Sequence, residues 1–306
     1  MARASRAHWA RETVPIRGNI PMAHSSSEPA TAPHHHSRAG VIGRYFRPHE
    51  AIPSRLSFGL KLSLFVLLML AWWLSTASGW VRPLFVPAPG SVLDAAVRLY
   101  TQEGLLTDLG VSVYRVAIGF GLAALIGTPL GVLMGTFRVT RSLFEPVLAF
   151  FRYMPATAFI PLLILWMGVG DGQKFAVIFI GTFFHYTLLV MNVTVNIPVH
   201  YIESAHTLGA RTWQTVLRVV WPASKPGILD NLRIILGWAW TYIVVAEMVA
   251  ADSGIGYVIL RASRFLDTET IFVGILSIGL VGIVSDYVFN LLSRYLFPYI
   301  KRERET

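Results

Sequence analysis

The chain has 306 residues, of which 54% are apolar and 14% charged, and it contains no cysteine. A soluble domain carries about 25% charged residues, so this composition indicates a polytopic membrane protein, and the lack of cysteine excludes disulfides and thiolate metal sites. The net charge of +9 does not indicate nucleic-acid binding, because residues 1–57 hold eight arginines and three glutamates, and most other basic residues fall in expected cytoplasmic loops.

Residues 1–57 are rich in Arg, Ser, Pro, Ala and His and show no hydrophobic periodicity. We therefore expect a disordered, basic cytoplasmic tail. The three histidines at 34–36 are not expected to form a metal site. No early apolar core with a cleavage site follows Met1, so the tail is not a standard signal peptide.

Residues 58–80 are predicted to form the first transmembrane helix. Its apolar part, residues 58–78, would span roughly 31 Å, enough to cross a hydrocarbon core of about 30 Å. Three tryptophans, Trp72, Trp73 and Trp80, lie toward the outer end, as in an interfacial aromatic belt.

The segment 81–108 is too polar to span the bilayer, and we expect it at the outer membrane surface. Ser91 is predicted to cap a short helix over residues 92–100. Helical spacing places four residues on its apolar face: Leu93, Ala96, Val97 and Tyr100.

A permease-like core is predicted over residues 109–297, beginning with a second span at 109–134. This span carries small residues at intervals of four: Gly119, Ala123, Gly127, Gly131 and Gly135. Such a stripe allows another helix to approach closely in lipid, so we expect helix packing; a substrate gate along the stripe is the alternative.

The remaining spans follow from the apolar runs. A short inner loop, 136–146, precedes a third span at 148–169 that Pro155 and Pro161 should kink. An outer turn at 170–174 leads to the fourth span. The later segments are the fourth span at 175–195, the fifth at 228–250, an outer connection at 251–270, the sixth at 271–296 and a cytoplasmic tail at 298–306.

The longest polar break in the second half, residues 198–226, is predicted to form two short amphipathic helices joined at Gly209. Pro198 fits a first helical turn, and glycine readily takes the left-handed conformation that ends a helix. Pro222 should end the second helix. Its apolar face is expected to carry Trp213, Val216, Leu217 and Val220.

The spacing E-S-A-x3-G-x9-V-V-W-P in this break resembles the EAA loop, E-A-A-x3-G-x9-I-x-L-P, of ATP-binding-cassette importer permeases. Four residues match the pattern: Glu203, Ala205, Gly209 and Pro222. Ser204, Val219 and Trp221 depart from it. The alternative interpretation is an ordinary helix–turn–helix loop between spans. The resemblance implies that Glu203, Ser204, Ala205, Gly209 and Pro222 couple the chain to an ATPase.

Three further runs resemble the nitrate/sulfonate/taurine branch of these permeases: VPAPGSVLDAAV, GFGLAALIGTPLGVLMG and RYMPATAFIPLLILWMGVG. The resemblance covers about residues 86–296. It implies an all-α membrane protein with six transmembrane helices, the type I ABC importer permease fold and a cytoplasmic coupling-helix loop. It also implies a homodimer in the bacterial inner membrane that imports nitrate, a sulfonate or taurine, or bicarbonate by alternating access.

The implied partners are a cytoplasmic ABC ATPase, which uses the ATP, and a periplasmic or lipid-anchored solute-binding protein. This chain should bind no nucleotide or metal, because its nearest approach to a phosphate loop, residues 168–174, has the wrong spacing. No catalytic motif such as H-E-x-x-H or G-x-S-x-G occurs, so a membrane-embedded enzyme is disfavoured. An ATP-independent secondary transporter or channel remains the alternative.

Charge asymmetry orients the chain. The tail, the 136–146 loop and the 198–226 loop hold thirteen basic residues, and residues 301–304 add three, whereas the outer segments hold five. The positive-inside rule therefore places both termini and the Glu203 loop in the cytoplasm.

Four ionisable residues fall within the predicted spans away from their inner ends: Arg115, His185, Glu247 and Asp286. Such residues usually face the bundle interior or a water path. Arg115 and Glu247 have similar depth in the outer leaflet, so we expect them to lie near one another; independent snorkelling to water is the alternative. We expect His185 to be hydrogen-bonded within the structure rather than to relay protons. Asp286 has no evident partner.

Overall fold

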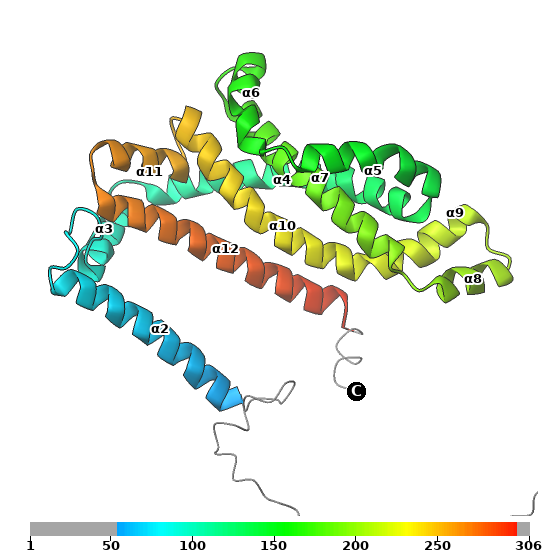
Figure 1. Ribbon diagram of the computed structural model, residues 1–306, viewed down its shortest axis with the longest axis horizontal. Coiled ribbons are helices and arrows are strands. Elements are labelled where there is room, and N and C mark those ends of the chain that lie inside the picture. Colours follow the sequence, from blue (N-terminus) through cyan, green and yellow to red (C-terminus); the bar gives the residue numbers. More distant parts are fainter. Residues whose placement is uncertain (1–53, 299–306) are drawn as a thin grey trace, which may run out of the picture. The chain divides into compact units, whose positions relative to one another are not determined.

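The computed structural model describes residues 54–298, in which all regular secondary structure is helical (Figure 1). Most of the predicted tail lies outside the described residues, but residues 54–57 begin a helix instead of continuing the tail. The chain divides into two units, residues 1–62 and 63–306. The packing described below is within the second unit.

The elements follow one another along the chain with short connections. They are α2 (Ser54–Ala77), α3 (Pro89–Thr101), α4 (Leu105–Thr136), α5 (Arg138–Arg152), the 3-10 helix η1 (Ala156–Phe159), α6 (Ile160–Met167), α7 (Asp171–Val195), α8 (Val199–Thr207), α9 (Thr212–Thr215), the π-helix η2 (Val216–Val220), α10 (Trp221–Ala250), α11 (Ile255–Arg264) and α12 (Thr268–Leu296).

Five helical segments among the described residues are long and apolar enough to cross a membrane. They are Leu56–Ala77, Leu105–Thr136, Asp171–Val195, Thr212–Ala250 and Thr268–Leu296. A sixth span exists if the bent pair α5 and η1–α6 counts as one. The prediction of six spans therefore corresponds to five long helices and one broken one.

The predicted third span and the loop before it are wrong in detail. Helix α5 already begins at Arg138, inside the expected loop, and it ends at Arg152. The chain then bends by 83° before continuing through η1 and α6. Pro155 explains the break, because it lacks an N–H and disfavours helical backbone at Met154.

The prediction that Pro222 ends a helix is also wrong. Pro222 lies in the first turn of α10, which continues from η2 without interruption to Ala250. In η2 the hydrogen bonds are widened by one residue, so that the N–H of Trp221 reaches the carbonyl of Val216. The wider turn accommodates the proline ring, which would clash with a carbonyl four residues earlier in a regular α-helix.

The outer segments pack differently from the prediction. Helix α3 begins at Pro89, and the Ser91 hydroxyl donates to the Ala88 carbonyl instead of capping the helix. Its buried face carries Val92, Ala95 and Leu99, whereas the expected face residues Leu93 and Val97 are exposed. The buried face packs against α11, a ten-residue helix within the expected outer connection, and against Val273 of α12.

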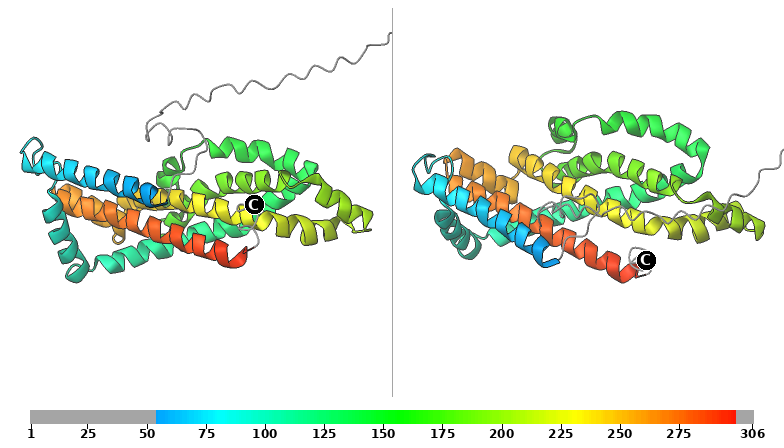
Figure 2. Two further views of the ribbon diagram at one scale, coloured as in Figure 1. Left: turned by 90° about the horizontal axis from the view of Figure 1, so that it is seen from below. Right: turned by 60° about the horizontal axis from the view of Figure 1, so that its bottom comes forward.

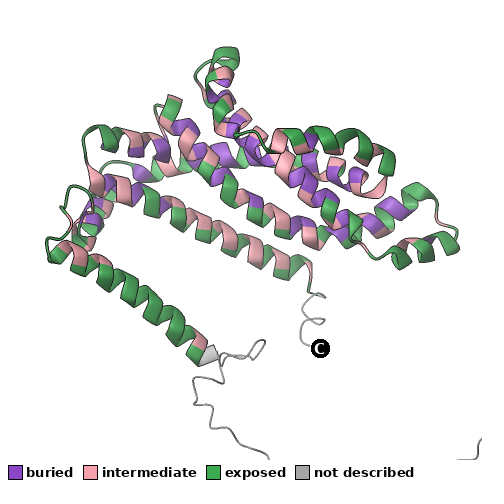
Figure 3. Ribbon diagram, in the orientation of Figure 1, coloured by how far each residue is buried: buried purple, intermediate pink, exposed green. Residues whose placement is uncertain are grey.

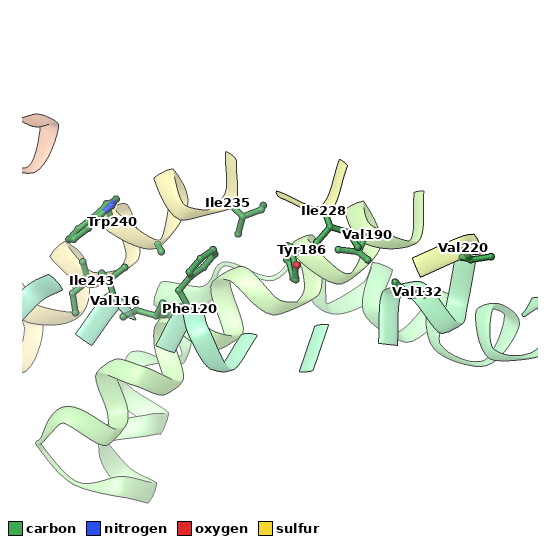
Figure 4. Packing of buried hydrophobic residues seen from close by; sticks show 12 residues of the cluster. Val116, Phe120, Val132, Tyr186, Val190, Val220, Ile228, Ile235, Trp240 and Ile243 are labelled. Atoms are coloured by element: carbon green, nitrogen blue, oxygen red, sulfur yellow. The ribbon is translucent and has the colours of Figure 1, made fainter. Parts of the chain in front are cut away.

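The main core joins α4, α7 and α10 (Figure 4). Val116, Phe120 and Val132 come from α4, Tyr186 and Val190 from α7, and the α10 side contributes Ile228, Ile235, Trp240 and Ile243. Many apolar side chains of α12 and of α2 are exposed (Figure 3). In lipid this exposure costs little, since the surrounding tails are equally apolar.

The stripe of small residues on α4 lies against α7. Ala123 is fully buried. A Cβ added at Gly127 would lie 2.8 Å from the Thr187 hydroxyl, and one at Gly119 would lie 2.8 Å from the Ile178 Cβ. Gly135 faces Thr194 at similarly close range. Backbone approach of this kind is possible only where side chains are minimal.

Replacing Gly131 by alanine should destabilise the chain. The new Cβ would lie 2.7 Å from the Thr187 carbonyl oxygen and from the Val190 Cβ. Overpacking of this kind costs about 1–3 kcal/mol, so thermal unfolding in detergent should begin at a lower temperature. Gly121→Ala is the control, because Gly121 is on the same helix with nothing near its added Cβ. Equal unfolding temperatures for the two variants would contradict the packing described here.

Candidate functional site

The chain reversal after α8 is built on Gly209. Its φ of +79° is left-handed, as predicted for a helix stop at this position. The N–H of Ala210 donates to the Ala205 carbonyl (2.9 Å), and the Gly209 N–H donates to the His206 carbonyl (2.9 Å). This pair of bonds is a Schellman motif, which satisfies the last carbonyls of the helix.

The loop has a buried side and an exposed side. Ala205, Val216 and Val220 are buried beneath it, so half of the predicted apolar face packs inward. The other half is exposed to solvent: Trp213 is 59% exposed and Leu217 is 50% exposed. Tyr201 and Leu208 are exposed as well. We call Tyr201, Leu208, Trp213 and Leu217 the exposed loop surface.

Helices α8 and α9, which carry part of the exposed loop surface, lie at one end of the helix bundle, and α3 and α11 lie at the other (Figure 2). Glu203 and Ser204 are also exposed on α8. The Thr207 hydroxyl donates to the Glu203 backbone carbonyl (2.9 Å), a bond that does not involve the Glu203 carboxylate. These residues are therefore accessible for contact with another protein.

Arg115 and Glu247 form a direct ion pair at the opposite end, as their matched depth predicts. Arg115 Nη1 lies 2.9 Å from Glu247 Oε1, and the two side chains are 3% and 0% exposed. The guanidinium also donates to Asp171 through Nε (2.7 Å) and to the Ser253 carbonyl (2.8 Å). Independent snorkelling of the two charges is thus excluded, and the pair connects α4, α7, α10 and the segment before α11.

The Glu247 carboxylate is fully surrounded by donors. The Ser112 hydroxyl lies 2.8 and 2.9 Å from its two oxygens, and the Gly256 N–H donates at 2.9 Å. Gly254 has a φ of +104°, and a Cβ there would overlap the Glu247 carboxyl group. Only glycine permits this approach, which explains the two glycines in the 251–270 connection.

Arg233 is the partner of Asp286 that the sequence did not reveal. Its Nε and Nη2 donate to the two carboxylate oxygens, and its Nη1 donates to Asn290 (2.9 Å). Arg233 lies near the inner end of the predicted fifth span, where a basic side chain can reach water and its position alone does not indicate a partner. Comparing the depths of all ionisable residues on α10 and α12 would have paired them.

His185 is not hydrogen-bonded to any residue in the range 54–298, contrary to expectation. Its ring contacts the Trp238 ring edge to face, with centroids 4.8 Å apart. His185 also lines a cavity where α5 breaks, together with residues of α7 and α10. The structure does not bring it to Arg115 or Glu247.

Several members of the network around Arg115 and Glu247 were missed from the sequence: Asp108, Ser112, Asp171, Ser253 and Gly256. Asp108 accepts a hydrogen bond from the Gly254 N–H (2.7 Å). Asp171 lies within the expected outer turn at 170–174, so its proximity to Arg115 could have been inferred from topology. The serine and backbone contacts carry no sequence signal, because they depend on how the segment before α11 folds back.

Residues 127–302 match the family model of the binding-protein-dependent transport system inner membrane component. This match spans more than half of the chain and includes the Gly209 loop, the bent pair and the Glu247 end of α10. The chain belongs to this family. It is a multi-pass membrane protein of the ABC transporter permease class.

This permease matches curated relatives over most of the length of each relative. A protein of Brucella abortus, named a probable ABC transporter permease, is 38% identical over 80% of this chain and 96% of the relative. The taurine transport system permease protein TauC of Escherichia coli is 29% identical over 78% of this chain and 89% of its own. The nitrate import permease protein NrtB of a Synechocystis strain is 28% identical over 70% of this chain and 81% of its own.

The fold is also found in a solved structure. An inward-facing form of the methionine ABC transporter MetNI contains a chain that matches with a TM-score of 0.56 and 20% identity, over 62% of this permease and 95% of that chain. The predicted type I importer permease fold is therefore confirmed, and so is the nitrate/sulfonate/taurine branch by the relatives named above.

Glu247→Gln should destabilise the permease strongly. Arg115 would keep Asp171 but lose the negative charge it contacts in the interior, and a broken buried pair costs about 3 kcal/mol or more. The measurement is thermal unfolding of the purified permease in detergent.

Glu145→Gln is the matched control, because Glu145 pairs with Arg141 on a helix surface where both side chains are about 40% exposed. That change should have little effect, because solvent screens an exposed pair. Equal destabilisation by the two substitutions would show that the buried pair has no special role.

Proposed function

We propose that this permease is the transmembrane subunit of an ATP-driven, binding-protein-dependent importer that moves a small anion or related solute by alternating access. The substrate class is that of nitrate, sulfonates or taurine, or bicarbonate. The support is the membership in the permease family together with relatives named for taurine and for nitrate transport.

The observation that carries the proposal is the exposed loop surface. Large apolar residues that protrude from a short polar loop are typical of a protein docking site, since isolated loops in water gain nothing from exposing them. The loop is also stiffened by the Schellman motif at Gly209. A stiff projection can transmit the movement of a docked partner to the helices behind it.

The proposed partner at this surface is a cytoplasmic ABC ATPase, one for each permease of a homodimer. Glu203 and Ser204 would contact it, Ala205 and Gly209 would shape the turn, and Pro222 would hold the start of α10. Both termini and the loop are then cytoplasmic, as the positive-inside rule requires. The ATPase binds and hydrolyses the ATP, and the permease itself is not an enzyme.

The opposite end of the bundle would face a solute-binding protein, which is periplasmic or lipid-anchored. Arg115, Glu247 and His185 would border the translocation path between the two permeases. The buried ion pair supports this assignment, because charges held within membrane spans commonly lie beside substrate pathways. Lipid would cover the exposed apolar faces of α2 and α12.

Gly209→Asp should prevent the ATPase from copurifying with the permease while membrane insertion remains intact. The aspartate would strain a left-handed backbone position and add a charge next to the exposed loop surface. The measurement is affinity purification from native membranes through a C-terminal tag, followed by identification of accompanying subunits.

Gly104→Asp is the matched control. Gly104 has nearly the same φ, +73°, and equal open space, but it lies at the start of α4 at the opposite end of the bundle. The control should keep its ATPase. A wild-type permease that purifies alone, and whose uptake activity survives ATP depletion, would overturn the proposal in favour of a secondary transporter or channel.

A further inference from the structure

The break between α5 and η1 opens into a cavity of about 380 Å³. Small-molecule sites commonly have volumes of about 300–1,000 Å³, so this cavity is large enough for a compact organic solute. The residues that line it come from the break, from α7 and from α10. They include Arg152, Tyr153, Gly181, His185, Trp238 and Tyr242.

Arg152 places a positive charge at this cavity, and no carboxylate there neutralises it. No aspartate or glutamate lines the cavity, and within residues 54–298 none lies within ion-pair distance of Arg152. Arg115 and Arg233, which lie in other spans, both have acidic partners. Arg152 only donates to the Tyr153 hydroxyl (2.9 Å) and lies over that ring, 4.9 Å from its centroid.

An unpaired guanidinium in a membrane span is costly unless an anion or water reaches it. Interrupted helices at membrane depth are likewise tolerated only where they are buried in protein or line a water-filled cavity. Both features meet at Arg152. The arrangement therefore indicates a place that an anion occupies during transport.

Aromatic rings form the apolar part of the cavity. Trp238 and His185 contact one another edge to face, at 4.8 Å between centroids. Tyr242 lies where a Cβ at position 181 would be, so that Gly181 makes room for its ring. These walls suit a hydrocarbon group, and their polar atoms, like Arg152, offer donors to oxygen.

We propose that this cavity is a substrate site for a small organic oxyanion with an uncharged hydrocarbon body, held by Arg152 at its anionic group and by Trp238 and Tyr242 along its body. The inference rests on the proposed function and narrows its substrate class. A zwitterion such as taurine binds more weakly, because its ammonium group meets no carboxylate in the cavity and is repelled by Arg152.

Ethanesulfonate and taurine test this directly, because they differ only by the ammonium group. Saturation-transfer NMR on the full-length permease in lipid nanodiscs, with any subunits that accompany it, detects weak binding without ATP or a solute-binding protein. Ethanesulfonate should bind the wild type more tightly than taurine. Arg152→Gln should weaken ethanesulfonate binding about tenfold, the loss expected for a charged hydrogen bond.

Arg138→Gln is the matched control, since Arg138 is exposed at the start of the same helix and does not line the cavity. Arg152→Lys should restore part of the affinity, and equal elution volumes show that the variants are folded. The site is overturned if the wild type gives no ethanesulfonate signal, if taurine binds as tightly, or if Arg152→Gln binds as the wild type does. ATP-driven uptake by the same permease, reconstituted into sealed liposomes with its ATPase and a solute-binding protein, reports separately on the proposed function.

Discussion

The buried contact between Arg115 and Glu247 is the interaction on which the end of this permease opposite the Gly209 loop depends. Removing both charges from water is expensive, and their attraction offsets that cost only if every remaining lone pair and proton is satisfied. Ser112, Asp171, Ser253 and the Gly256 N–H supply those bonds. The requirement fixes the positions of α4, α7, α10 and the chain that enters α11.

The absence of water inside the membrane also explains the small residues on α4 and in the segment before α11. Helices in lipid gain no hydrophobic free energy from contacting one another, so they associate through close packing and hydrogen bonds. The stripe on α4 allows α7 to approach, and Gly254 allows the backbone to reach Glu247. Where the requirement for satisfied groups is locally relaxed, at the α5 break, a cavity and an arginine without a carboxylate are found together.

Helix α10 joins the two ends of the molecule. Its 30 residues extend about 45 Å, from the π-helix of the loop to the Glu247 network. Because Pro222 lies in the first turn of this helix and does not separate it from the loop, a displacement of the exposed loop surface would reach Glu247 through one continuous element. In the proposed mechanism this helix transmits ATPase closure to the outer side of the membrane.

Much of the fold could be predicted from the sequence, because the apolar runs, the glycine stripe and Gly209 act through local rules of length and backbone conformation. The pairing of Arg115 with Glu247 followed from depth alone. The sequence did not predict that Pro222 lies inside a continuous helix, since the π-turn that accommodates it depends on the continuity of the helices around it. The buried face of α3 and the cavity beside Arg152 were missed because both depend on contacts between distant segments.

Electron paramagnetic resonance distances test the proposed coupling most directly. The permease has no cysteine, so His206→Cys on the exposed loop carries the only spin label of each subunit. In the purified transporter, the distance between the two loop labels should shorten when the ATPase is trapped in its ATP-bound state and lengthen after hydrolysis. A distance that stays the same in both states, or the absence of a second label within range, would contradict a homodimer driven by movement of these loops.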